Sequence, residues 1–134
     1  MTTKGRVTVH GLGRFGGGVG AARFLAREGW QVTVTDLQSE LALQDSLAAL
    51  EGADIRFVLG RHERKDFTDT DLVIANPAVS PKNEHLLAAR EAGVAIATEI
   101  GLFLERCPAK VVAITGTQGK SSTAHFLYQL LIAS

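Results

Sequence analysis

The sequence has few cysteines, aromatic residues and prolines: one cysteine, one tryptophan, one tyrosine and three prolines among 134 residues. The single thiol, Cys107, cannot form an internal disulfide and suits a reducing compartment. No apolar run approaches the length of a membrane span, and the first residues lack the apolar core of a signal peptide. These absences predict a cytoplasmic protein that makes no use of a membrane.

Excess charge of either sign is also missing. Fourteen basic and fourteen acidic residues give a formal net charge of zero. Proteins that bind nucleic acids or anionic membranes normally need a basic field, so neither partner is expected. Hydrophobic residues make up 46% of the chain, which is enough for a real core. The length fits one domain, or one domain and a piece of the next.

Short β-branched runs alternate with longer helical patterns, as in βαβ units. This alternation predicts an α/β fold with a Rossmann-like open parallel sheet and flanking helices. The expected strands are residues 7–10, 31–35, 55–59, 72–75 and 94–97, with a sixth at 111–115. The expected helices are residues 19–28, 40–50, 80–92 and 99–106, and a last one from 120 to the end. Ser80 is the expected cap of the third helix, and Gly93 its end.

The pattern divides the chain into a first domain over residues 1–98 and the beginning of a truncated second domain over residues 99–134. The run 111–114 is entirely apolar, as in a strand buried on both faces. Such a strand needs a partner, because an apolar edge invites pairing. We expect residues 111–134 to pair with the edge of the first sheet or with the same segment of a second chain. The apolar stripe of the last helix should pack on that surface, through Phe126, Leu127, Leu130 and Leu131.

The first glycine-rich turn, Gly11-Leu12-Gly13-Arg14-Phe15-Gly16, follows the first strand and opens a helix. Gly13 would let the backbone approach a diphosphate, and Gly16 would let the helix pack closely on the strand. Asp36 ends the second strand, where a ribose-binding carboxylate usually lies. The turn therefore predicts a nucleotide-diphosphate site. The alternatives are glycines that serve packing alone and an Asp36 that merely ends a strand in solvent.

The second glycine-rich turn, Gly116-Thr117-Gln118-Gly119-Lys120-Ser121-Ser122, lies between the sixth strand pattern and the last helix. Its backbone N–H groups would cradle phosphates, Lys120 would reach the β and γ oxygens, and the Ser121 hydroxyl would ligate Mg²⁺. The usual P-loop spacing would place its first glycine where Ile114 stands, so this loop is shorter. The alternative is an ordinary strand-to-helix turn.

The shorter loop, Thr115 to Ser121, is similar to the ATP-binding loop of the Mur ligases and their folylpolyglutamate-synthase relatives. Further segments strengthen the resemblance to the Mur ligases, in particular to the type that adds D-glutamate. These segments are Gly11-Leu12-Gly13, Asp36, Asn76-Pro77-Ala78-Val79 and Glu99-Ile100-Gly101-Leu102-Phe103. The resemblance runs from Val7 to the end of the chain.

The resemblance implies a three-domain, monomeric enzyme of peptidoglycan synthesis. With ATP and Mg²⁺, such an enzyme phosphorylates the carboxylate of UDP-N-acetylmuramoyl-L-alanine, and the amine of D-glutamate attacks the acyl-phosphate. This chain would supply the UDP-binding domain and the ATP loop, and would be inactive alone. By resemblance, the UDP-substrate contacts would be Gly13, Arg14, Phe15, Gly16, Asp36, Gly60 and Asn76. The ATP contacts would be Gly116, Thr117, Gln118, Gly119, Lys120, Ser121 and Ser122, with Lys120 catalytic and Ser121 on Mg²⁺.

Three positions depart from the family pattern. Phe15 stands where Thr or Ser is common, Leu37-Gln38 replaces a polar pair, and Gln118 stands where Asn is usual. Three other functions remain open. They are another Mur-type ligase, an NAD-binding Rossmann domain, which the first turn and Asp36 fit equally well, and a module that binds a UDP-sugar without turnover. The second glycine-rich turn disfavours the NAD-binding alternative.

Two further groups of polar residues predict no site. The four histidines, His10, His62, His85 and His125, share no metal-ligand spacing. The mixed-charge run 61–66 is expected to be a solvated loop.

Overall fold

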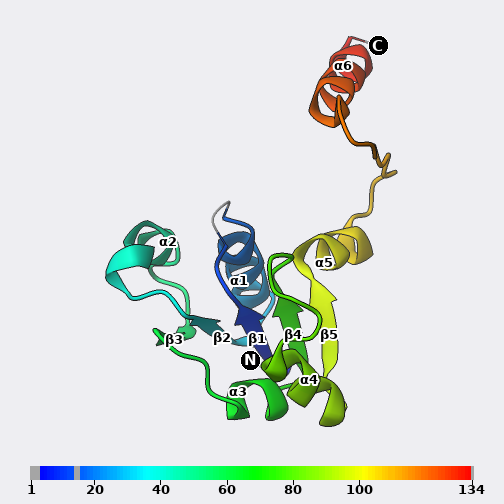
Figure 1. The fold of residues 1–134 in the computed structure, drawn as a ribbon. Coiled ribbons are helices and arrows are strands. Elements are labelled where there is room, and N and C mark those ends of the chain that lie inside the picture. Colours follow the sequence, from blue (N-terminus) through cyan, green and yellow to red (C-terminus); the bar gives the residue numbers. More distant parts are fainter. Residues whose placement is uncertain (1–3, 14–15, 134) are drawn as a thin grey trace. The chain divides into compact units, whose positions relative to one another are not determined.

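The central feature of the fold is a five-stranded parallel sheet with the order β3-β2-β1-β4-β5 (Figure 1). The computed structural model describes residues 4–13 and 16–133. The chain forms two compact units, Met1–Phe103 and Leu104–Ser134, and each is treated separately below. The strands are β1 (Arg6–His10), β2 (Gln31–Asp36), β3 (Ile55–Leu59), β4 (Leu72–Ala75) and β5 (Ala95–Thr98).

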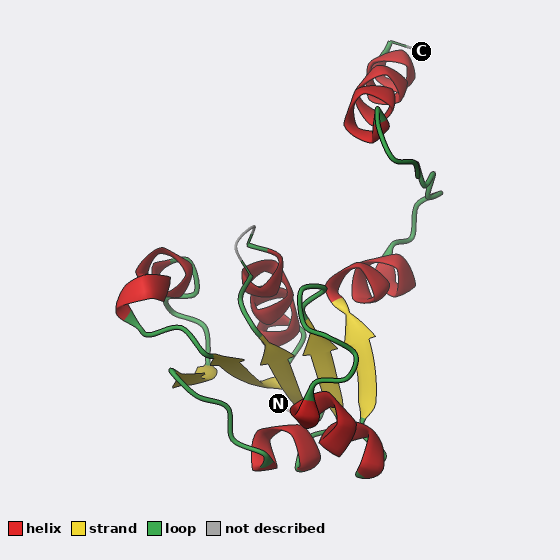
Figure 2. Ribbon diagram, viewed as in Figure 1, coloured by secondary structure: helices red, strands yellow, loops and turns green. Residues whose placement is uncertain are grey.

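Helices flank the sheet (Figure 2). In the first unit they are α1 (Gly17–Arg27), η1 (Leu41–Leu43), α2 (Gln44–Ala48), α3 (Lys65–Thr68), α4 (Glu84–Glu91) and the start of α5 (Glu99–Arg106). A further helix, α6 (Lys120–Ile132), belongs to the second unit. Because side chains alternate along a strand, β1 sends Val7 and Val9 into one core with α1. A second core contains Phe67 of α3 and Leu86 of α4. The expected open parallel sheet is therefore confirmed, with the first two strands adjacent and parallel.

The helix before β5 begins later than its sequence suggests. Ser80 is not the cap; its Oγ accepts a hydrogen bond from the Lys82 amide within the preceding turn. Asn83 caps α4 instead, because its Oδ1 accepts hydrogen bonds from the amides of His85 and Leu86. The prediction of a helix from residue 80 was wrong at this end, since Ser and Asn are both good caps and the local pattern does not separate them.

The expectation of a solvated loop at residues 61–66 was also wrong at its end. Lys65–Thr68 forms the short helix α3, and Asp66 is 6% exposed. The Thr8 hydroxyl donates to the backbone oxygen of Asp66 (2.5 Å), and Arg56 Nη1 lies 2.6 Å from Asp66 Oδ1. The charge pattern did not show that Asp66 is buried, because its backbone oxygen and its carboxylate find their partners on two strands, Thr8 on β1 and Arg56 on β3.

Three histidines that are far apart in the sequence meet beside Phe67. The ring centroid of His10 lies 4.7 Å from that of His62 and 6.4 Å from that of His85, and the His85 ring stacks on Phe67. No group of His, Cys, Asp or Glu among the described residues is arranged to hold a metal ion. Burial, assisted by the neighbouring His62 and His85, lowers the pKa of His10 to about 4, against the weaker opposing effect of Asp36.

The second unit contains no strand among its described residues. Residues 111–115 form neither helix nor strand, and the sheet of the first unit ends at β3 and β5. The predicted strand at residues 111–115 was therefore wrong. In the expected α6 stripe, Phe126 is 68% and Leu130 70% exposed. Without neighbouring strands a single apolar segment gains no ladder bonds. Pairing of residues 111–134 with the edge of the first sheet or with a second chain stays a prediction.

No helix in the part of the chain that the structure describes has the length and apolar character needed to cross a bilayer.

The histidine cluster predicts a pH-dependent stability. The pKa of His10 is about 4 in the folded chain against 6.5 for a free side chain, so the unfolded chain binds more protons between these values. The free energy of unfolding should be greatest above about pH 6.5 and fall as the pH is lowered towards about 4. Urea unfolding at a series of pH values measures it.

The variant His10→Gln should flatten this dependence, whereas His125→Gln, on the exposed surface of α6, should leave it unchanged. If the His10→Gln protein kept the full pH dependence of its free energy of unfolding, His10 would not be the cause of that dependence.

Candidate functional site

The candidate site lies at the carboxyl ends of β1 and β4. These strands are neighbours, but the chain leaves β1 towards α1 and leaves β4 towards α4. In an open parallel sheet the loops diverge at such a point and leave a crevice, where ligands of this fold bind. The crevice is bordered by the glycine-rich turn after His10 and by the turn that begins at Asn76.

Glycine conformations fix the path of the first turn. Gly11 and Gly13 have φ values of +86° and +71°, which other residues rarely adopt. The backbone of the turn comes closest to α1 at Gly18, where a Cβ would overlap with Gly11 O and would lie 2.6 Å from Leu12 Cα and 2.7 Å from Leu12 O. Among the described residues, nothing lies within 4 Å of a Cβ at Gly16. The prediction that Gly16 permits close packing was therefore wrong. Gly18 has that role, because it is the residue that faces the turn.

Asp36 joins the two loops at this end of the sheet. Its Oδ2 accepts a hydrogen bond from the Leu12 amide (3.0 Å), and its Oδ1 accepts one from the Gln38 amide (2.9 Å). Gly11 is held next to it, because its amide donates to the Thr35 oxygen (2.8 Å). Each carboxylate oxygen can accept a second hydrogen bond, so Asp36 can orient the loops and still accept one from a ligand hydroxyl.

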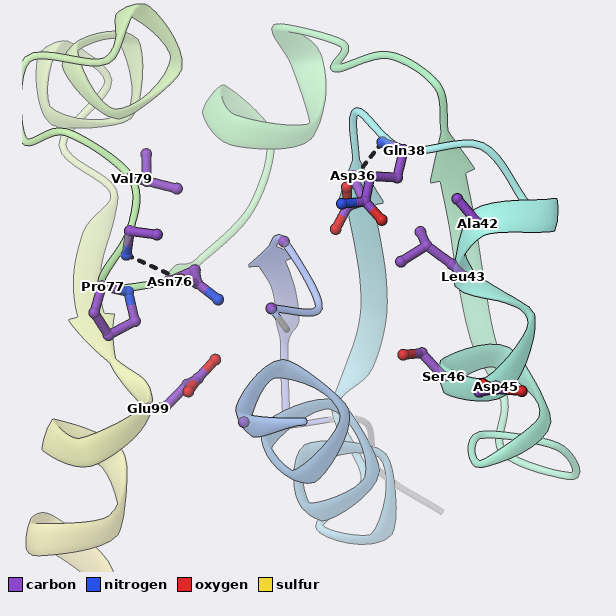
Figure 3. A pocket seen from close by; sticks show the side chains of 14 residues that line it. Asp36, Gln38, Ala42, Leu43, Asp45, Ser46, Asn76, Pro77, Val79 and Glu99 are labelled. Carbon is purple, nitrogen blue, oxygen red and sulfur yellow. Dashed lines mark hydrogen bonds between the residues drawn. The ribbon is translucent and has the colours of Figure 1, made fainter. Parts of the chain in front are cut away.

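Asn76 faces the glycine turn from β4. Its Oδ1 accepts a hydrogen bond from the Ala78 amide (2.9 Å), which fixes the direction of the side chain. The amide nitrogen then points at Gly13, where a Cβ would overlap with it. A glycine is thus required at position 13, both by the positive φ and by the Asn76 side chain next to it. The Asn76 nitrogen is left as a donor at the wall of the crevice (Figure 3).

The crevice is a cleft of about 850 Å³. It is lined by Gly11, Gly13, Gly17, Asp36, Gln38, Ala42, Leu43, Asp45, Ser46, Asn76, Pro77, Ala78, Val79 and Glu99. Among these described residues there are three carboxylates and no lysine or arginine. An anion in the cleft would depend on backbone N–H groups at the start of α1, on the helix dipole and on the Asn76 amide.

Glu99 also lines the cleft, although the sequence analysis assigned it no role in the site. It is the first residue of α5 and follows β5 directly, so it lies at the same edge of the sheet as Asp36. Its carboxylate lies against Gly17, so that a Cβ on Gly17 would overlap with it. The sequence did contain one signal for Glu99, because it comes immediately after a predicted parallel strand. Burial raises the pKa of the Glu99 carboxyl.

The other predicted residues of the UDP site differ in their placement. Gly60 does not line the cleft; its amide donates to the backbone oxygen of Gln38 (2.9 Å), which does. Gly16 forms the N-cap of α1, with φ +75°. Arg14 and Phe15 lie outside the described residues. The departure from the family pattern at Phe15 therefore lies outside them too.

The second glycine-rich turn leads into α6. Gly119 is the N-cap, with φ +74°, and Gly116 has φ +150°. Lys120 Nζ donates a hydrogen bond to the Gly116 oxygen (2.6 Å), so the ammonium lies over the loop. The Thr123 amide donates to the Gly119 oxygen (2.9 Å) and closes the first helical turn. The predicted strand before this loop is absent, whereas the predicted helix after it is present.

Comparison with known proteins gives consistent results. A family model described as "Mur ligase MurD-like, N-terminal domain" matches residues 5–98. UDP-N-acetylmuramoylalanine–D-glutamate ligase of Roseiflexus is 48% identical over 126 residues, which are 94% of this chain and 27% of the relative. The same-named protein of Trichlorobacter lovleyi is 46% identical over 129 residues, 96% of this chain and 28% of the relative. The chain spans about a quarter of the length of these relatives.

Solved structures give the same fold. The UDP-N-acetylmuramate-alanine ligase MurC of Thermotoga maritima has a TM-score of 0.59 and 27% identity to this chain. The match covers 94% of this chain and 30% of that one.

The close approach at Gly18 predicts a clear difference between two glycines of the same helix. Gly18→Ala should destabilise the chain by roughly 1–3 kcal/mol, because the added methyl meets the backbone of Leu12 rather than a movable side chain. Gly20→Ala is the matched control, since nothing lies within 4 Å of its Cβ. It should stabilise the chain by about 0.5–1 kcal/mol through helix propensity. Urea unfolding measures both, and equal effects would contradict the assignment.

Proposed function

Because the chain belongs to the family of Mur ligase MurD-like N-terminal domains, we propose that it supplies the substrate-binding domain of a peptidoglycan-precursor ligase. The enzyme would join D-glutamate to UDP-N-acetylmuramoyl-L-alanine with ATP, through an acyl-phosphate. The observation that carries this proposal is the conjunction of the β1–β4 cleft with family membership over residues 5–98. The names of the relatives support D-glutamate as the added amino acid.

The cleft would hold the UDP part of the substrate. Its diphosphate would lie at the start of α1, where backbone N–H groups and the helix dipole favour a negative charge. The Asn76 amide would donate to a phosphate oxygen, and Asp36 would accept from a hydroxyl or imide N–H of the uridine. Arg14 and Phe15 complete the proposed contact set by resemblance. Gly60 would act indirectly, through Gln38.

The loop Gly116–Ser122 would bind ATP and Mg²⁺. Its described residues fit such a group, since two glycines of positive φ lead to a helix N-terminus and the Lys120 ammonium lies over the loop. Lys120 would stabilise the β and γ phosphates, Ser121 would ligate Mg²⁺, and the amides of Thr117 to Ser122 would contact phosphate oxygens. ATP, when bound, supplies the phosphoryl group that activates the substrate carboxylate.

Ligand selectivity tests the proposal against the NAD-binding alternative. The 134-residue chain should bind UDP-N-acetylmuramic acid more tightly than NAD in calorimetric titration. The variant Asp36→Ala should weaken binding roughly tenfold or more, because a charge-assisted hydrogen bond contributes about 1.5–3 kcal/mol. Asp54→Ala, an acidic residue that does not line this cleft, should leave the affinity unchanged. Tighter binding of NAD would contradict the proposal.

The ATP loop is tested independently of the cleft. ATP binding to this chain should be weak, and Lys120→Ala should weaken it further by roughly tenfold or more, through loss of a charge-assisted hydrogen bond. Lys110→Ala removes an exposed lysine of the same unit outside the loop and should have no such effect. Fluorescence titration with a labelled ATP analogue measures both. Equal losses in the two variants would show that Lys120 provides general positive charge and no specific contact.

A further inference from the structure

The Glu99 carboxylate occupies an unexpected position for a site that is proposed to hold a diphosphate. It comes from the start of α5 and points towards the first turn of α1, on the same side of the cleft as Asn76 (Figure 3). The overlap with a Cβ on Gly17 shows that the carboxylate lies against the backbone at this helix start. A diphosphate at the start of α1 would therefore lie beside an acidic side chain.

Among the described residues that line the cleft, no lysine or arginine neutralises Glu99. Its Oε1 is buried, and among the described residues it has no hydrogen-bond partner. The first turn of α1 presents no acidic side chain, and the loop after β4 presents Asn76 and Pro77, which are neutral. The other titratable groups that line the cleft are Asp36 and Asp45, both acidic. A third negative charge next to a bound diphosphate would cost binding energy unless it were neutralised.

A proton removes this conflict and adds a contact. A protonated carboxyl group carries one O–H donor, and phosphate oxygens are strong acceptors. We propose that Glu99 is a specificity-determining residue of the cleft, which binds a nucleoside diphosphate ligand in its protonated form and takes up one proton from solvent on binding. The inference rests on the proposed function of the cleft. Burial acts in the same direction, since it raises the pKa of this carboxyl before any ligand arrives.

Proton uptake on binding has a defined thermodynamic sign. The affinity should be highest where Glu99 is already protonated and should fall as the pH rises through the pKa of the free chain. Once Glu99 is ionised in the free chain, the loss for a single proton approaches about tenfold for each pH unit. UDP-N-acetylmuramic acid is a suitable probe, because its diphosphate diester and its carboxylate do not titrate between about pH 6 and pH 8.

The test is calorimetric titration of the 134-residue chain with UDP-N-acetylmuramic acid between about pH 5 and pH 8, in two buffers of different ionisation enthalpy. The unmodified chain should show proton uptake and a falling affinity as the pH rises. Glu99→Gln, which keeps a donor but cannot titrate, should bind with an affinity that varies little with pH and should exceed the unmodified chain at pH 8. Glu40→Gln, an exposed glutamate outside the cleft lining, is the matched control and should behave as the unmodified chain.

The remaining outcomes separate the inference from the proposed function. Equal pH dependence in the unmodified chain and Glu99→Gln would overturn the role of Glu99 and leave the cleft as the ligand site. Loss of binding in a folded Glu99→Gln protein at every pH would also overturn it, because Glu99 would then act as an acceptor. Absence of binding in all three proteins would overturn the proposed function, and with it this inference.

Discussion

The contact between Gly18 and the backbone of Leu12 is the constraint on which the site depends. It allows α1 to begin directly against the turn that follows β1. The two backbones are so close that a Cβ at Gly18 would overlap with the backbone of the turn. The Gly18 amide donates to the Leu12 oxygen (3.1 Å), so the approach is also hydrogen-bonded. Because of this contact, the positive end of the α1 dipole faces the gap between β1 and β4. A larger residue at this position would move the helix start away from the cleft.

The second property of the site is the balance of its charges. Three carboxylates line the cleft, which borders the N-terminus of α1, and its described lining contains no basic residue. Asp36 is used structurally, since both of its oxygens accept backbone amides of the surrounding loops. Glu99 has no such use, and its Oε1 is buried without a partner among the described residues. The two acids therefore differ in role although they line the same cavity, and this difference leads to proton-linked binding.

The sequence predicted the parallel sheet and the position of Asp36 because strand periodicity and glycine turns are local signals. It did not predict the short helix at Lys65–Thr68, since Asp66 is buried by partners on β1 and β3. The choice of Gly16 over Gly18 as the packing glycine failed because spacing does not show which residue faces the turn. Glu99 was missed as a lining residue for the same reason. The strand at residues 111–115 failed because an apolar run forms a strand only when neighbours are available to pair with it.

The claim that the β1–β4 cleft holds a nucleoside diphosphate is tested most directly by amide NMR spectra of the chain during titration with UDP-N-acetylmuramic acid. The account predicts the largest shifts at Gly11 to Gly18, with further shifts at Asn76 and Glu99. Residues of α3 and α4, on the opposite face of the sheet, should change little. Shifts concentrated on those helices or on residues 116–122, with an unchanged glycine turn, would contradict it.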